Sequence, residues 1–402
     1  MKYVVILGDG MADYPIPELN NKTPLQVAKK PFIDGLCKHA EVGVFKTVPD
    51  GMKPGSDVAN LSVLGYNPEQ GYTGRSPLEA ASIGIELKET DVTARANLVT
   101  LTDEPNYEDK TIVDYSGGEI STEEARELIV YLAQHLNDQT YTLYSGVSYR
   151  HCLVVNNGVI VGDLTPPHDI TGKPIKGKLP HGEKGEAYLR LMEKSYELLK
   201  AHPINQKRIA LGKNPANSLW LWGEGTKPSL ENFEEKFGVK GGMISAVDLL
   251  KGMGKLAGMR VIEVDGATGN YDTNFQGKAE ACLNALEKGL DMVYIHMEAP
   301  DECGHHGDLE HKIYSIEQID KVAESVVKGL EQLGEEFAIL IAPDHPTPIS
   351  TLTHSAQPVP YLLYRSNKNL FNGATAYDEE NAKRCGVFEP NGYKMMEKLI
   401  KG

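Results

Sequence analysis

The chain has 402 residues, of which 41% are hydrophobic and 24% are charged, and its formal net charge at pH 7 is −15. This length favours two domains, and the composition is that of a globular protein. The acidic balance argues against nucleic acids and anionic membranes as partners, so an anionic ligand would need a local cluster of basic side chains or a metal ion.

Four short apolar runs are predicted to be strands of one sheet, and each ends in a turn that carries acidic or histidine side chains. They cover residues 3–10, 259–269, 291–298 and 337–346. Runs this apolar are typical of parallel strands buried on both faces. Apolar stripes with helical spacing at 278–290 and 315–333 alternate with these runs. The pattern predicts an α/β fold with a doubly wound, mostly parallel sheet.

The middle of the chain is more polar and has shorter alternating runs from about residue 88 onward. We predict that residues 88–201 form an inserted α+β domain and that residues 1–87 and 202–402 form the core. The segment 164–185 is rich in proline and glycine, as expected of a return linker or an active-site loop. The strand-like run 217–225 is predicted to lead back into the core.

Aspartate and histidine side chains recur where the predicted strands end, which is where open α/β sheets bind ligands. They are Asp9, Asp301, His305, Asp344, His345 and His354. Any one of them could simply cap a helix or face solvent. Together they predict a site for Zn²⁺, Mn²⁺ or a similar divalent ion. His306 directly follows His305, and the four-residue spacing from Asp301 favours His305 as the ligand.

Ser56 is the candidate nucleophile. It follows Gly55 at the start of a segment with apolar residues at helical spacing. Capping the helix is its simplest role. However, a helix N-terminus also favours anions, and a metal ion on the serine oxygen would lower its pKa. Ser56 is thus suited to carry a phosphoryl group. The chain has no P-loop, no complete dinucleotide-binding motif and no G-x-S-x-G motif.

The remaining features bear on where the protein works. No apolar run reaches the roughly 18 residues that a membrane-spanning helix needs. Residues 1–10 enter a strand without the hydrophobic region of a signal peptide, so none is expected. Five scattered cysteines without CxxC spacing predict a reducing cytoplasm. Cys303 is interpreted as a small filler, with zinc binding as the alternative.

Several motifs, in this order along the chain, resemble the alkaline-phosphatase superfamily and, within it, the archaeal-type cofactor-independent phosphoglycerate mutases. The motifs are ILGDGMAD, PGSDVANLSVLGY, GYTGRSPLEAASIGI, APDECGHHGD and PDHPTP…THS. The resemblance runs through nearly the whole chain. It implies an alkaline-phosphatase-like core with an inserted substrate-binding cap domain. It also implies two divalent ions, usually Mn²⁺ or Zn²⁺ with Mg²⁺ or Co²⁺ as further options, beside a serine that is transiently phosphorylated.

The resemblance also assigns residues to roles. It implies one ion on Asp9, Ser56, Asp344 and His345, and the other on Asp301, His305 and His354. The residues implied to bind the carboxylate and phosphate of a small phosphorylated metabolite are Arg75, Arg95, Asn97, Arg150, His151 and His168. Arginine forks suit such ligands, although buried ion pairs are an equally ordinary use of arginine.

The reaction implied is the conversion of 3-phosphoglycerate to 2-phosphoglycerate, independent of 2,3-bisphosphoglycerate. Glu298 departs from the pattern, since the archaeal mutases typically have lysine there. A bacterial branch that resembles this chain has been proposed to be homoserine kinase, and Glu298 would attract the ammonium group of homoserine. Helix capping or salt bridging by Glu298 is the ordinary alternative. A phosphatase or sulfatase relative would fit the same metal site, but the two-domain arrangement with its TPPHD loop argues against it. The presence of Ser56 together with all six Asp and His ligands argues against a metal-binding module that has lost catalysis. The sequence leaves open whether the protein forms a homo-oligomer.

Overall fold

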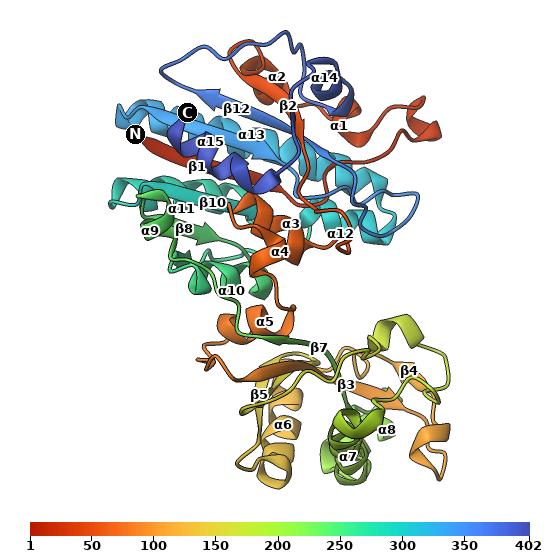
Figure 1. Ribbon diagram of the computed structural model, residues 1–402. Coiled ribbons are helices and arrows are strands. Elements are labelled where there is room, and N and C mark those ends of the chain that lie inside the picture. Colours follow the sequence, from red (N-terminus) through yellow and green to blue (C-terminus); the bar gives the residue numbers. More distant parts are fainter. The chain divides into compact units, whose positions relative to one another are not determined.

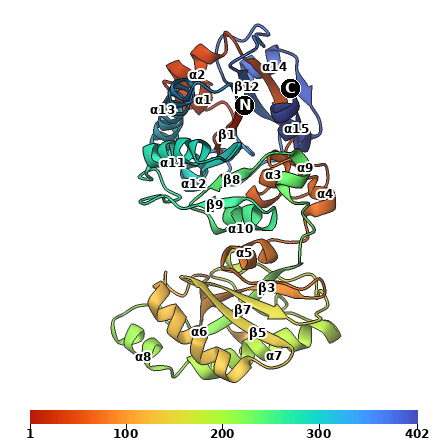
Figure 2. The same ribbon diagram turned by 90° about the vertical axis from the view of Figure 1, so that its left-hand side faces the viewer.

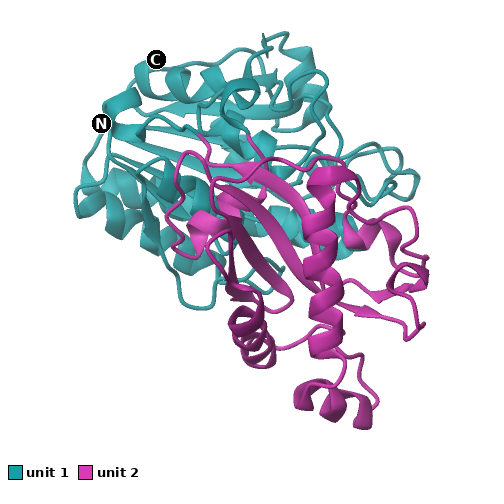
Figure 3. Cartoon of the chain, turned by 60° about the horizontal axis from the view of Figure 1, so that its bottom comes forward, with its two compact units in different colours: residues 1–72, 229–402 teal, residues 73–228 magenta.

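The computed structural model describes residues 1–402, which divide into two compact units (Figures 1 and 3). Unit 1 comprises Met1–Tyr72 and Ser229–Gly402, and unit 2 comprises Thr73–Pro228. Unit 2 is therefore one continuous insertion into unit 1. It begins earlier and ends later than the predicted range 88–201, because the last strand of its sheet and a helix before its first strand belong to it.

Unit 1 contains an eight-stranded sheet with the strand order β13-β2-β12-β11-β1-β10-β8-β9. The strands are β1 (Lys2–Gly8), β2 (Glu41–Phe45), β8 (Gly241–Ile244), β9 (Arg260–Ile262), β10 (Met292–Met297), β11 (Phe337–Ala342), β12 (Val359–Arg365) and β13 (Phe388–Glu389). Strand β12 runs antiparallel to β11 and β2, and the other pairings are parallel. The predicted mixed α/β class with a mostly parallel sheet is thus confirmed.

Helices cover both faces of this sheet (Figure 2). The helices of unit 1 are α1 (Pro24–Val27), α2 (Pro31–Leu36), α3 (Ser56–Val63), α4 (Pro68–Gly71), α9 (Phe233–Phe237), α10 (Asp248–Leu256), α11 (Phe275–Glu287), α12 (Ala299–His306), α13 (Leu309–Leu333), α14 (Glu379–Arg384) and α15 (Met395–Lys401), with the short 3₁₀ turns η1 (Pro17–Leu19) and η4 (Gly392–Lys394). Helices α11 and α13 lie on one face and α15 on the other. None of the helices is both long and apolar enough to span a membrane.

The three central strands β11, β1 and β10 are almost entirely buried, as their continuous apolar runs predict. The apolar run at 259–269 does begin with a strand and end in a turn, but its predicted burial on both faces is wrong. Only β9 forms there, at the edge of the sheet and partly exposed. The chain then leaves the sheet through a turn in which Ala267 N–H donates to the Val264 carbonyl. An edge position therefore replaces the predicted buried one.

Unit 2 has a five-stranded antiparallel sheet in which β3 pairs with β4, β6 and β7, and β6 pairs with β5. Its elements are α5 (Ser76–Ser82), β3 (Val92–Leu101), η2 (Tyr107–Asp109), β4 (Ile112–Asp114), α6 (Thr122–Leu136), β5 (Tyr141–Val147), β6 (Arg150–Val155), η3 (Pro167–Ile170), α7 (Gly182–Leu199), α8 (Pro203–Ala210) and β7 (Ser218–Thr226). Side chains of β3, α6, α7 and β7 form its hydrophobic core.

Strand β7 explains the position of the unit boundary. The run 217–225 was predicted to lead back into the core, but β7 pairs with β3 along Val92–Val99. Helix α5, before β3, packs against β3 and β7. Both ends of unit 2 are therefore held by its own sheet, and the chain returns to unit 1 only after β7.

Candidate metal centre and arginine cluster

The carboxyl ends of three adjacent parallel strands bring the predicted aspartates together in unit 1. In register, Gly8 of β1 lies opposite Met297 of β10, and Leu7 lies opposite Ala342 of β11. The residues that follow these strands therefore leave the sheet at one edge, as the sequence predicts. Two groups of side chains form there, and each could hold a metal ion.

The first, here called the Asp9 group, consists of Asp9, Asp344 and His345, all buried, with candidate ligand atoms within 4.8 Å of one another. His345 Nε2 lies 3.4 Å from Asp9 Oδ1 and 3.2 Å from Asp344 Oδ2. Ser56 Oγ lies 3.1 Å from the same nitrogen. Gly55 is the N-cap of α3 and Ser56 is its first residue. The candidate nucleophile thus contacts the Asp9 group from a helix N-terminus.

The second, here called the Asp301 group, consists of Asp301, His305 and His354, also with ligand atoms within 4.8 Å of one another. His305 Nε2 lies 3.3 Å from Asp301 Oδ2, and His354 Nε2 lies 3.5 Å from Asp301 Oδ1. The two imidazole Nε2 atoms are 2.9 Å apart. Asp301 and His305 are one turn apart in α12, whereas His306 is largely exposed and bonds to its own helix at the Glu302 carbonyl. The helical spacing therefore distinguishes His305 from His306.

The electrostatics of the Asp9 group favour a cation. Burial, followed by repulsion from Asp344, Asp301 and Glu298, raises the pKa of Asp9 well above its usual range. Asp9 Oδ2 accepts a hydrogen bond of 2.8 Å from His296 Nε2, but Asp9 Oδ1 is buried and has no hydrogen-bond partner. A buried carboxylate oxygen without a donor is costly, and a divalent ion would satisfy it. Burial also lowers the pKa of His345, which keeps the ring neutral as a ligand must be.

The charges of the Asp301 group are balanced differently. The hydrogen bond to Asp301 raises the pKa of His305 to about 9. Burial raises the pKa of Asp301, but hydrogen bonds from His305 and His354 outweigh it and hold that pKa well below its usual range. A proton on the His305 imidazole thus neutralises Asp301. A metal ion would replace that proton.

Two side chains that the sequence reasoning missed hold the Asp9 group in place. Asn60 Nδ2 donates to Asp344 Oδ2 at 2.7 Å and to the Ser56 carbonyl at 2.9 Å. Asn60 Oδ1 accepts from the buried Tyr294 hydroxyl at 2.6 Å. Asn60 lies one turn after Ser56 on α3, and this spacing was the available signal. The first turn of α3 is therefore fixed to Asp344.

A second feature, here called the arginine cluster, lies in unit 2. Glu79 accepts from Arg75 Nε at 2.8 Å, and its second oxygen is 2.9 Å from Arg95 Nε. The Arg95 guanidinium stacks on the Trp222 ring, 4.2 Å from the ring centre. Burial lowers the pKa of Arg95 to about 10, so it remains a cation at neutral pH. Glu79 and Trp222 were not predicted, because only the fold reveals their contact with the arginines.

Of the other predicted substrate residues, Asn97, His168 and Arg150 lie near the arginine cluster, whereas His151 does not. Asn97 Oδ1 accepts from Trp222 Nε1 at 3.0 Å, and the His168 ring lies 5.3 Å from the Trp222 ring. Arg150 pairs with Asn97 across β6 and β3, and its charge acts on Arg95. His151, the next residue of β6, is buried and accepts from Gly146 N–H at Nδ1. Since adjacent strand residues face opposite sides of a sheet, His151 points away from the cluster.

Glu298 stands at the N-cap of α12 without a side-chain capping bond. Its carboxylate packs against the loop after β9, where a Cβ added to Gly269 would come within 2.4 Å of Glu298 Oε2. Lys278 is buried nearby and donates to the His296 carbonyl at 3.0 Å. Burial lowers the pKa of Lys278 to about 8, and the charge of Glu298 opposes that shift. The negative charge of Glu298 is thus partly offset by an amine from α11.

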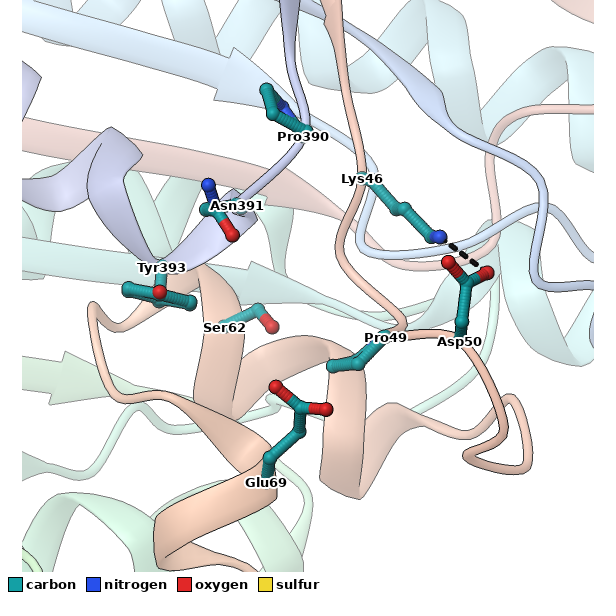
Figure 4. A pocket seen from close by; sticks show the side chains of 9 residues that line it. Lys46, Pro49, Asp50, Ser62, Glu69, Pro390, Asn391 and Tyr393 are labelled. Carbon is teal, nitrogen blue, oxygen red and sulfur yellow. Dashed lines mark ion pairs between the residues drawn. The ribbon is translucent and has the colours of Figure 1, made fainter.

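A separate cavity of about 170 Å³ lies near the other end of α3 (Figure 4). Ser62 from that helix lines it, together with Glu69, Tyr393 and the ion pair Lys46–Asp50. Its lining contains no residue of either metal group. We therefore do not assign the predicted chemistry to this cavity.

Comparisons with known proteins decide the family. Residues 37–205 match the family model for 2,3-bisphosphoglycerate-independent phosphoglycerate mutase. The chain is 48% identical over 401 residues to a probable 2,3-bisphosphoglycerate-independent phosphoglycerate mutase of Geobacter sulfurreducens, covering 100% of both chains. The chain belongs to this family. It is also 49% identical over 386 residues to the enzyme of that name from Methanosarcina barkeri, covering 96% of this chain and 95% of the relative.

Solved structures support the same family at the level of the fold. A protein of Pyrococcus horikoshii matches with a TM-score of 0.83 and 28% identity, covering 100% of this chain and 96% of that one. The cofactor-independent phosphoglycerate mutase of Thermoplasma acidophilum matches with a TM-score of 0.66 and 28% identity, covering 100% of this chain and 99% of that one. The predicted membership of the phosphoglycerate mutase family is thus confirmed.

Proposed function

We propose that this member of the phosphoglycerate mutase family interconverts 3-phosphoglycerate and 2-phosphoglycerate through a phosphorylated Ser56. The family match supports the substrate, and the contact of 3.1 Å between Ser56 Oγ and His345 Nε2 carries the assignment of the nucleophile. The hydroxyl lies at the N-terminus of α3, where backbone N–H groups favour a phosphoryl group.

The Asp9 group with Ser56 would hold one divalent ion, and the Asp301 group the other. Mixed aspartate and histidine ligands suit Mn²⁺ or Zn²⁺, and Mg²⁺ or Co²⁺ are further options. When bound, such ions supply positive charge to the substrate phosphate and lower the pKa of the serine hydroxyl. The buried, partnerless Asp9 Oδ1 supports this proposal independently of the family.

Transfer proceeds in two displacements at phosphorus. Ser56 Oγ loses its proton and forms a bond to phosphorus while the bond from phosphorus to the substrate oxygen breaks, and the departing glycerate oxygen takes up a proton. The glycerate then presents its other hydroxyl, which loses its proton and forms a bond to phosphorus while the bond from phosphorus to Ser56 Oγ breaks, and the departing Ser56 Oγ takes up a proton. In unit 2 the arginine cluster would bind the carboxylate or phosphate, with Arg75, Arg95 and Arg150 as cations and Asn97 and His168 as polar neighbours.

Homoserine kinase is the second candidate, and Glu298 is the observation that favours it. Its carboxylate lies close enough to Asp9 to raise that pKa, so it would also attract a substrate ammonium group. The buried Lys278 reduces this attraction. For this reason we place the mutase first.

Five unpaired cysteines support a cytoplasmic location.

One experiment separates the two functions. The metal-loaded protein is assayed side by side on 3-phosphoglycerate alone and on homoserine with ATP. We expect 2-phosphoglycerate to form without 2,3-bisphosphoglycerate or nucleotide. Formation of homoserine phosphate in the absence of mutase activity would overturn the proposal.

A further inference from the structure

Thr347 lies between the two metal groups and contacts both. Its hydroxyl donates a short hydrogen bond to Asp301 Oδ1 and lies 3.2 Å from His345 Nδ1. The side chain is fully buried. One hydroxyl therefore joins a residue of the Asp301 group to a residue of the Asp9 group, a connection that nothing in the sequence pattern assigned.

The single proton of this hydroxyl fixes the direction of both bonds. The hydroxyl donates to the carboxyl oxygen Asp301 Oδ1, so the Thr347 proton points toward Asp301. The hydroxyl oxygen can then only accept from His345, and His345 must carry its proton on Nδ1. Its Nε2 lone pair is left facing Asp9 Oδ1 and Ser56 Oγ. Thr347 thereby selects the tautomer that a metal ligand needs.

The backbone around Thr347 leaves the side chain little freedom. A Cβ added to Gly10 would lie 2.5 Å from Thr347 Oγ1, and one added to Gly304 would lie 2.5 Å from the Thr347 carbonyl oxygen. That carbonyl accepts from Lys312 Nζ at 2.7 Å, and the same amine donates to Asp13 at 2.8 Å. Lys312 and its Asp13 partner are fully buried. The threonine is therefore held from both sides by close packing and by a buried ion pair.

We propose that Thr347 is a positioning residue that couples the two metal groups. Its hydroxyl fixes Asp301 Oδ1 and keeps His345 Nε2 directed into the Asp9 group. This inference rests on the proposed function, since it concerns how the two ions are held. Its consequence is that loss of this one hydroxyl weakens the binding of both ions. Loss of a group that supports only one site weakens the binding of one ion.

The test compares three variants as metal-free proteins titrated with Mn²⁺, with ion stoichiometry and affinity measured by calorimetry and by the electron paramagnetic resonance of free Mn²⁺. Thr347→Val keeps the shape and removes the hydroxyl, and Thr347→Ser keeps the hydroxyl. Thr351→Val is the matched control, because Thr351 lies in the same loop, is exposed and bonds only to the Pro348 and Thr353 carbonyls. Circular dichroism and thermal unfolding without metal report on the fold.

We expect Thr347→Val to lower the affinity for both ions by about 10- to 100-fold, as the loss of other hydrogen-bonding partners of metal ligands does. Thr347→Ser and Thr351→Val should bind both ions like the wild type. Unchanged affinities in folded Thr347→Val, or loss at one site alone, would overturn the inference while the proposed function stands. If Thr347→Val does not fold, weak binding by Thr347→Ser overturns it. A folded wild type that binds fewer than two ions would overturn the proposed function itself.

Discussion

The candidate metal centre of unit 1 and the arginine cluster of unit 2 are opposite in charge and in construction. The carboxylates of the first are buried and repel one another, and hydrogen bonds from Asn60, His296 and Thr347 fix them in place. The cations of the second are held by one carboxylate, Glu79, and by stacking on an aromatic ring. Each region therefore carries an excess of one charge, and the proposed metal ions and anionic substrate would supply the opposite charges.

Removal of divalent ions should have the largest effect of the changes considered, because all the candidate metal ligands lie in unit 1 and the arginine cluster needs no metal. Chelation should abolish turnover completely, and Mn²⁺ or Zn²⁺ should restore it. Each bound ion should also stabilise the fold, by about 2.7 kcal/mol at a free concentration 100 times its Kd. Activity assays and thermal unfolding with and without metal measure both effects. Full activity in a protein shown to be metal-free by elemental analysis would contradict the assignment.

Ser56→Ala should reduce kcat by at least about 1,000-fold, because the nucleophile is lost while the fold and the metal groups remain. Phosphoprotein analysis after brief incubation with substrate should find label on the wild type and none on the variant. Ser62→Ala is the control, since Ser62 lies at the other end of α3 and donates to the Thr47 carbonyl. Appreciable turnover by folded Ser56→Ala would remove Ser56 as the nucleophile.

Arg95→Met tests the other side of the comparison. It should lower kcat/KM for 3-phosphoglycerate by about 10- to 100-fold through loss of a charge-assisted contact, while the metal content stays at two ions. Arg190→Met is a suitable control in the same unit, because Arg190 is exposed on α7. Loss of metal from Arg95→Met would show that the arginine cluster also affects metal binding in unit 1.

His296→Leu should have the smallest effect and should sharpen the distinction within unit 1. It removes the hydrogen bond to Asp9 Oδ2, so the affinity of the Asp9 group for Mn²⁺ should fall by about tenfold and that of the Asp301 group should not change. Calorimetric titration resolves the two sites. Equal weakening of both would mean that coupling runs through the Asp9 group as well as through Thr347.

The ends of the central strands could be predicted from sequence because the same chemistry recurs after each buried apolar run. Asp9, Asp301, Asp344 and His345 needed only strand assignment and the geometry of a parallel sheet. The supporting partners could not be found in this way. Asn60 and Tyr294 are 234 residues apart in sequence, and their hydrogen bond exists only in the folded chain.

The boundary of the insertion was missed for a related reason. The apolar run of β7 looks like any core strand, and its pairing with β3 is a choice between two sheets that local sequence does not encode. His151 shows the same limit at the scale of one residue. Its neighbour Arg150 faces the arginine cluster, and the strand alternation that turns His151 away depends on the register with β3.

The order of the strands also bears on synthesis of the protein. Strand β1 and Asp9 leave the ribosome first, but both neighbours of β1 in the sheet, β10 and β11, lie beyond residue 291. Unit 2 is continuous in sequence and can complete its own sheet in the meantime. Both metal groups need residues from beyond β10, so neither can form until the last third of the chain has emerged. Capture of the proposed metal ions would thereby be deferred to the end of translation, by which time all of unit 2 has emerged.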